Sequence, residues 1–100
     1  MATATVPSFA PTAAVNLPVG VTSANVVIPT TGTPQAAIVT NIGEHTTFVQ
    51  MGVGNTTAAT TATSLAITPG DSIALTIGTN TYIAGITLSG QSQLNIAVGS

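Results

Sequence analysis

The stretch TPGDSIALTIG, residues 68–78, carries the clearest structural signal in the chain. Within it, Ile73, Leu75 and Ile77 alternate strictly with small or polar residues. Alternation of this kind predicts a β-strand with one buried and one exposed face, as found in antiparallel sheets. The preceding Pro69 and Gly70 fit the second and third positions of a type II turn. A turn followed by such a strand is the basic unit of an all-β domain.

Similar units recur on both sides of this stretch. Short apolar runs separated by turn residues follow one another from Ala24 to Val98. We expect about seven strands, at residues 24–28, 35–41, 46–53, 65–67, 72–78, 81–88 and 93–98. A spacing of about 8–12 residues between strands favours a small antiparallel β-sandwich or jelly-roll-like domain over alternating βα units. The expected fold class is therefore all-β.

The first 22 residues differ from the remainder because Pro7, Pro11 and Pro18 interrupt an apolar sequence. Proline lacks the N–H that a strand ladder needs and biases the residue before it towards extended conformations, so we expect an extended arm. We divide the chain into an extended N-terminal arm, residues 1–22, and a β-sandwich domain, residues 23–100. The apolar arm residues expected to anchor on a partner are Val6, Phe9, Val15 and Leu17. The alternative is a disordered tail.

Charged groups are almost absent from the chain. It has 100 residues, with no lysine or arginine and two acidic residues. Without side-chain cations the protein cannot neutralise phosphates, so we expect neither nucleic-acid nor anionic-lipid binding. No apolar run reaches the length of about 18 residues that indicates a transmembrane helix, and the start of the chain lacks the basic region of a signal peptide. We expect no membrane partner.

This composition also has a consequence for the surface. Only 2% of the residues are charged, against about 25–35% on a typical soluble surface. Uncharged polar residues must therefore cover the exterior, or neighbouring subunits must bury it. A surface of this kind tolerates dense packing beside identical copies, because like charges do not meet. The composition favours an assembly subunit over a freely diffusing enzyme.

Few residues are available for catalysis. Glu44 and His45 are adjacent, and adjacent strand residues point to opposite faces, so the pair meets a common substrate only from a distorted turn. We interpret NIGEH, residues 41–45, as a hairpin turn with positive φ at Gly43 and the polar pair facing solvent. Asp71 is interpreted as a turn residue whose carboxylate bonds nearby backbone. A metal site needs about three or four ligands, and Glu44, His45 and Asp71 are the whole supply in the chain. We therefore expect no metal and no cofactor. Because His45 is the only candidate base, we also expect no catalytic residue and no enzyme.

From Ala36 to Gly99 the chain contains in succession VTNIG, TFVQMGVG, AITPGDSIALTIG, TYIAGIT and SGQSQLNIAVG. This succession resembles small structural proteins of tailed bacteriophages, namely head decoration (cement) proteins and related virion components built as small β-sandwiches. The resemblance covers about two-thirds of the chain and consists of strands and turns without a chemical signature. It implies a virion protein, a homotrimer on the outer surface of the capsid, that binds the major capsid protein and clamps neighbouring shell subunits.

Under this resemblance, the arm residues Val6, Phe9, Val15 and Leu17 become the expected shell contacts, by strand addition or by filling a groove. Many weak contacts would then act together. Deletion of residues 1–20 is expected to leave the domain folded but to abolish shell binding. The alternative function is a phage fibre, tail or glycan-recognition β module that binds sugar through loops such as residues 54–64. Sugar sites usually present aromatic platforms, and Tyr82, the lone candidate, is expected to pack within the sandwich instead.

Overall fold

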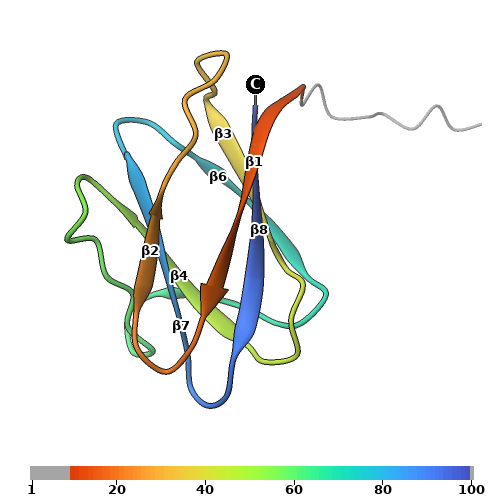
Figure 1. Ribbon diagram of the computed structural model, residues 1–100, viewed down its shortest axis with the longest axis vertical. Coiled ribbons are helices and arrows are strands. Elements are labelled where there is room, and N and C mark those ends of the chain that lie inside the picture. Colours follow the sequence, from red (N-terminus) through yellow and green to blue (C-terminus); the bar gives the residue numbers. More distant parts are fainter. Residues whose placement is uncertain (1–9, 100) are drawn as a thin grey trace, which may run out of the picture.

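The computed structural model describes residues 10–99, which form eight β-strands and no helix (Figure 1). The strands are β1 (Pro11–Val19), β2 (Ala24–Val27), β3 (Ala36–Asn41), β4 (Thr47–Gly52), β5 (Leu65–Ile67), β6 (Ser72–Thr76), β7 (Tyr82–Thr87) and β8 (Ser92–Gly99). All of the strands expected from the sequence are present, and β1 is an additional one. Within residues 10–99, no helix is long and apolar enough to cross a membrane.

The strands form two antiparallel sheets that pack face to face. Sheet A has the order β1-β8-β3-β6, and sheet B has the order β2-β7-β4-β5. The first half of the chain pairs with the second half in reverse order: β1 with β8, β2 with β7, β3 with β6 and β4 with β5. A long hairpin wound in this way is a double-sheet jelly roll. The predicted fold class, a small jelly-roll-like β-sandwich, is confirmed.

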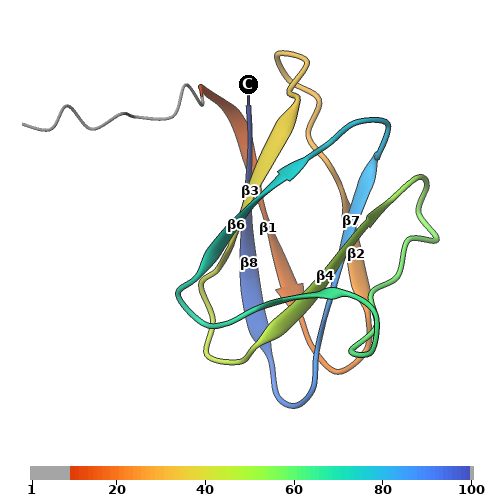
Figure 2. The same ribbon diagram turned by 180° about the vertical axis from the view of Figure 1, so that it is seen from behind.

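The connections gather at two ends of the sandwich. The β1–β2, β3–β4 and β7–β8 connections meet at the lower end in Figure 1. The β2–β3 and β6–β7 connections lie at the upper end, together with the start of β1 and the end of β8. Figure 2 shows the same arrangement from behind. We refer to these as the lower end and the upper end.

The core between the sheets is aliphatic. Its fully buried members come from both sheets and include Val39, Ile83, Leu94, Ile96 and Val98. Full burial of each such side chain stabilises the fold by about 1.5–3 kcal/mol. In β6, the alternating residues identified in the sequence face this core as predicted, with Ile77 buried just beyond the strand.

The structure changes the interpretation of the N-terminal region. From Pro11 onward the expected arm is strand β1, which pairs with β8 along its length. Leu17 and Val19 belong to the core, with 5% and 3% of their surface exposed. The prolines fit because β1 is an edge strand, where a missing N–H can face away from the ladder. The expected boundary at residue 23 therefore falls inside the sandwich, and deletion of residues 1–20 removes a core strand.

The two sheets approach each other closely at Gly85 in β7. A Cβ at this position would lie 2.7 Å from Val19 Cγ1 and 3.1 Å from Leu94 Cδ1, both in sheet A. The glycine is required here by space, because any larger side chain displaces the facing core residues.

We predict that Gly85→Ala lowers the free energy of unfolding by about 1–3 kcal/mol, because it overpacks the core. Gly20→Ala is the matched control, since a Cβ at Gly20 would meet only Gln91 Cγ, at 4.0 Å. Its stability should stay equal to that of the wild type or rise slightly. Chemical denaturation of the three proteins measures the effect. An equal loss in both variants would contradict the close contact between the sheets.

Candidate functional site

The candidate acid–base pair lies in the β3–β4 connection, which crosses from sheet A to sheet B. The expectation of a hairpin turn was wrong, because β3 and β4 belong to different sheets. Gly43 also lacks the expected positive φ. It is required by space, since a Cβ there would overlap the Ser92 hydroxyl group. Glu44 is exposed, as expected, whereas His45 is half-buried.

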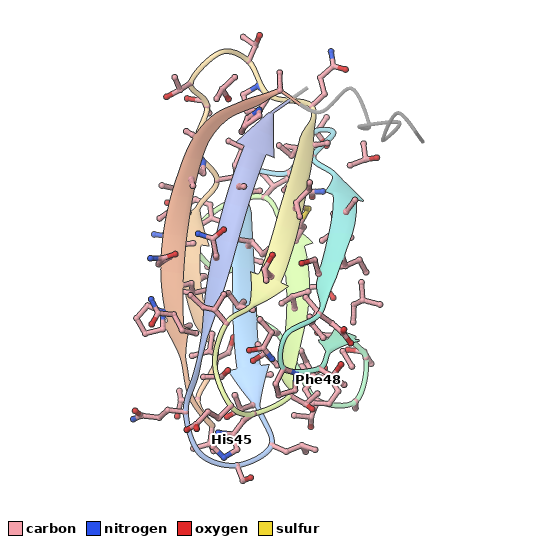
Figure 3. The ribbon with its side chains drawn as sticks, turned by 90° about the vertical axis from the view of Figure 1, so that its right-hand side faces the viewer. His45 and Phe48 are labelled. Atoms are coloured by element: carbon pink, nitrogen blue, oxygen red, sulfur yellow. The ribbon has the colours of Figure 1, made fainter. Side chains whose placement is uncertain are left out.

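His45 joins two connections at the lower end (Figure 3). Its Nδ1 lies 2.8 Å from the carbonyl oxygen of Gln91 in the β7–β8 connection. Because a carbonyl oxygen only accepts hydrogen bonds, Nδ1 is the donor. The imidazole also packs against Gly90, where a Cβ would lie 2.6 Å from His45 Cε1. These contacts give His45 a structural role in bracing the two connections.

Asp71 lies in the turn that the sequence predicted at residues 68–71. The Asp71 N–H donates to the Thr68 carbonyl at 3.0 Å, and Gly70 has a φ of 84°, so the type II turn is confirmed. The carboxylate accepts a hydrogen bond from the Thr68 hydroxyl rather than from backbone. Among residues 10–99, no group of three or more His, Cys, Asp or Glu side chains is placed to hold a metal ion. Glu44, His45 and Asp71 are thus not grouped as metal ligands.

A buried network around Asn41 occupies this end of the molecule instead. The Asn41 side chain is fully buried. Its Nδ2 donates to the carbonyl oxygens of His45 at 2.7 Å and Ile67 at 2.9 Å. Its Oδ1 accepts from the Ser92 hydroxyl at 2.7 Å and from the Gly43 N–H at 3.1 Å. The whole hydrogen-bonding capacity of the amide is therefore used.

Sequence patterns alone did not single out Asn41. Its position at the end of an apolar strand, two residues before a glycine, is the one signal that could have done so. Two of its partners, Ile67 in β5 and Ser92 in β8, lie far from Asn41 in sequence, so no local pattern reveals them.

The outer faces of the two sheets differ in how they are covered. On sheet B, the β4–β5 connection, residues 53–64, is fastened across β2. Asn25 Nδ2 donates to the carbonyl oxygens of Asn55 at 2.8 Å and Thr57 at 3.0 Å. Ala59 of the connection is buried. This connection contains the loop considered for glycan recognition, and its backbone is occupied in packing against the sandwich.

Within residues 10–99, no segment covers the outer face of sheet A, and Figure 3 shows its four strands side by side in front. The register places one outward residue of each strand in a single row across the sheet: Ala14, Ala97, Ile38 and Ala74. Ala14 and Ala74 are exposed, and the other two are half-buried. We call this outer surface of sheet A the open face.

A polar row lies beside the apolar row on the open face. Asn95 Nδ2 donates to Asn16 Oδ1 at 3.0 Å, and the hydroxyl groups of Thr40 and Ser72 lie 2.8 Å apart. The side chains form these two hydrogen-bonded pairs across neighbouring strands, and none of them is charged. The open face is thus formed by uncharged side chains, most of them small.

Two hollows lie on the surface of the described residues. One, of about 360 Å³, lies at the upper end and is lined largely by apolar residues such as Ile28, Pro34 and Ile77. The other, of about 240 Å³, lies along the side of the sandwich between β6 and the strands β4 and β5. Neither is lined by an acidic or basic side chain.

The structure separates the residues that the sequence grouped as partner-binding. Leu17 is buried in the core, and Val15 packs against it from the same face of β1. Val6 and Phe9 lie outside the described residues. Tyr82 is half-buried and faces outward from sheet B, because its neighbour Ile83 points into the core.

A scan against protein-family models finds no match to the chain, and a search of curated proteins finds none either. The fold of residues 10–99 is a jelly-roll β-sandwich in which these residues leave the uncharged outer face of sheet A uncovered.

We predict that Asn41→Ala lowers the free energy of unfolding by about 2–4 kcal/mol, because two carbonyl groups and a hydroxyl lose their buried partner. Asn95→Ala is the matched control, since it removes only an exposed hydrogen bond to Asn16. Its effect should stay within about 0.5 kcal/mol. Thermal and denaturant unfolding measure both variants. If the two lose the same stability, the Asn41 network does not hold the lower end together.

Proposed function

We propose that the protein is a capsid decoration (cement) protein, which binds the outside of a phage head and stabilises contacts between major capsid subunits. The open face of sheet A is the observation that supports this function most directly. Jelly rolls occur in viral capsid proteins and also in lectins and cupins. Because this fold serves several functions, the proposal rests on the outer surface of sheet A rather than on the fold.

The open face has the properties of a surface that packs against another protein. The centres of protein interfaces are depleted in charge, and the rows across this face contain no charged residue. Alanine side chains are short, so a partner can approach the sheet closely over Ala14, Ala97 and Ala74. With a net charge of −2 for the whole chain, copies can also sit side by side without strong repulsion.

The size of the open face indicates how such binding would work. Four strands of about five residues span about 19 Å by 17 Å, or roughly 300 Å². A stable pairwise complex buries about 800 Å² on each partner. One copy is therefore expected to bind weakly, and retention on the head relies on many linked copies acting together.

The alternative function, a fibre or glycan-recognition module, gains less support. Its candidate loop is fastened to β2 through Asn25, and Tyr82 offers a half-buried rather than an exposed aromatic surface. Sugar sites usually combine an aromatic platform with fixed polar groups that converge on a pocket.

The composition of virus particles tests the proposed function. Virus particles purified from the source of this chain should contain close to one copy per major capsid subunit, because decoration follows the repeat of the shell. Quantitative mass spectrometry of intact particles gives this ratio. A handful of copies per particle would instead indicate a fibre or tail component, and absence from the particle would overturn the proposal.

We predict that the double variant Ala14→Glu/Ala74→Glu loses at least about tenfold in affinity for heads stripped of the protein. The reason is that binding would bury unpaired carboxylates on the open face. Ala58→Glu is the matched control, an equally exposed alanine on the connection across sheet B. It should bind as the wild type does. Unchanged unfolding temperatures establish that both variants are folded, and equal binding by all three proteins would rule out the open face.

A further inference from the structure

The edge strands of the two sheets are unequally protected against added strands. β1 contains Pro11 and Pro18, β2 has four residues and β5 has three. β6 has five residues, with no proline, no charge and no bulge in its pairing with β3. Within residues 10–99, no strand pairs with the outer edge of β6. Such an edge presents unpaired N–H and C=O groups that can template another strand.

A groove runs beside this unpaired edge. It is the hollow of about 240 Å³ between β6 and sheet B, and its apolar lining includes Val49, Met51, Leu65 and Leu75. Leu65 is 44% exposed. A strand added to β6 would lie over this side groove and direct every second side chain into it. Strand addition of this type takes its affinity from main-chain hydrogen bonds and its specificity from the groove.

We propose that residues 2–6 of a second copy of this chain add to β6 and cover the side groove. These residues, ATATV, alternate Ala2, Ala4 and Val6 with threonines and end before Pro7. Threonine and valine favour strands, and small apolar side chains suit a shallow groove. The segment has no charged side chain, which matches the uncharged lining of the groove.

The distances favour a second copy over the same chain. The register across sheet A places Pro11 level with Thr76, but at the opposite edge of the sheet. A strand beyond β6 lies four strand spacings from β1, or about 19 Å. From Ala10, the chain can place Val6 at most about 14 Å away. The segment therefore falls short of its own β6 and can reach that of a neighbour.

This contact is heterologous, because the segment of one copy meets a different surface on the next. Repeated head to tail, it forms a ring if the rotation closes and an open filament if it does not; two copies can instead exchange segments reciprocally about a two-fold axis. The inference concerns two copies of this chain alone, so it stands independently of shell binding. If both proposals hold, the exchange links the weakly binding open faces into one multivalent unit.

Sedimentation velocity and light scattering of the full chain, over a range of concentrations, test the proposal. The wild type is expected to associate. Ala4→Pro, made together with Thr5→Pro because only every second N–H of a strand faces its partner, should weaken association at least about tenfold, since one of the two prolines removes a ladder donor in either register. Ser8→Pro is the matched control, since it lies beside Pro7 and outside the pairing residues. It should associate as the wild type does.

The groove is tested by Leu65→Glu, which places an unpaired charge where the added strand would pack. Leu88→Glu is its matched control, an exposed leucine at 68% in the β7–β8 connection. We expect Leu65→Glu to weaken association as Ala4→Pro/Thr5→Pro does, and Leu88→Glu to leave it unchanged. Thermal unfolding shows whether each variant is folded.

Three results would overturn the proposal. A wild type that stays monomeric at every concentration removes the contact altogether. Association that survives both Ala4→Pro/Thr5→Pro and Leu65→Glu places the interface elsewhere. Association lost in Ala4→Pro/Thr5→Pro but kept in Leu65→Glu shows that the segment binds another surface, such as the hollow at the upper end. None of these results decides shell binding, which is measured with the open-face variants.

Discussion

The buried amide of Asn41 fixes the point at which the chain passes from one sheet to the other. Its four hydrogen bonds reach the β3–β4 connection, β5 and the start of β8. Hydrophobic burial is not directional, so an aliphatic core alone does not specify which strand follows which. A fully satisfied buried amide specifies this order, because an arrangement that separates Asn41 from these partners leaves buried polar groups without hydrogen bonds. The winding of the jelly roll at its lower end depends on this constraint.

Hydrogen bonds between uncharged side chains also shape the surface. With almost no charged side chains, the protein places its polar atoms in rows that bond to one another, as Asn16 and Asn95 do on the open face. Within residues 10–99, the β4–β5 connection covers the outer face of sheet B, and no segment covers the outer face of sheet A. The two outer faces therefore differ in their coverage, and no strand of these residues pairs with the outer edge of β6.

Several features of the fold could be predicted from the sequence because their signals are local. The alternation in residues 72–78 gave the inward face of β6, and Pro69–Gly70 gave the type II turn with its positive φ at Gly70. The prolines of β1 were misleading, because proline is excluded from central strands but tolerated at an edge. Gly43 led to the wrong prediction of a turn with positive φ. A glycine can also be required because a neighbour, here Ser92, occupies the space of a side chain. The role of His45 depends on Gln91, a partner in a distant connection.

By itself, the sequence determined the positions of the β-strands in residues 24–98, the faces of the strand at residues 72–78, and the scarcity of groups for acid–base or metal chemistry. These follow from a period of two residues and from composition, which are properties of short windows or of the whole chain. Only the tertiary structure decided that β1 is a core strand, that no strand of residues 10–99 pairs with the outer edge of β6, and which sheet these residues leave uncovered on its outer face. Those outcomes depend on pairings such as Leu17 with Leu94, between residues far apart in the chain. Their energies arise only when the two sheets close on a shared core.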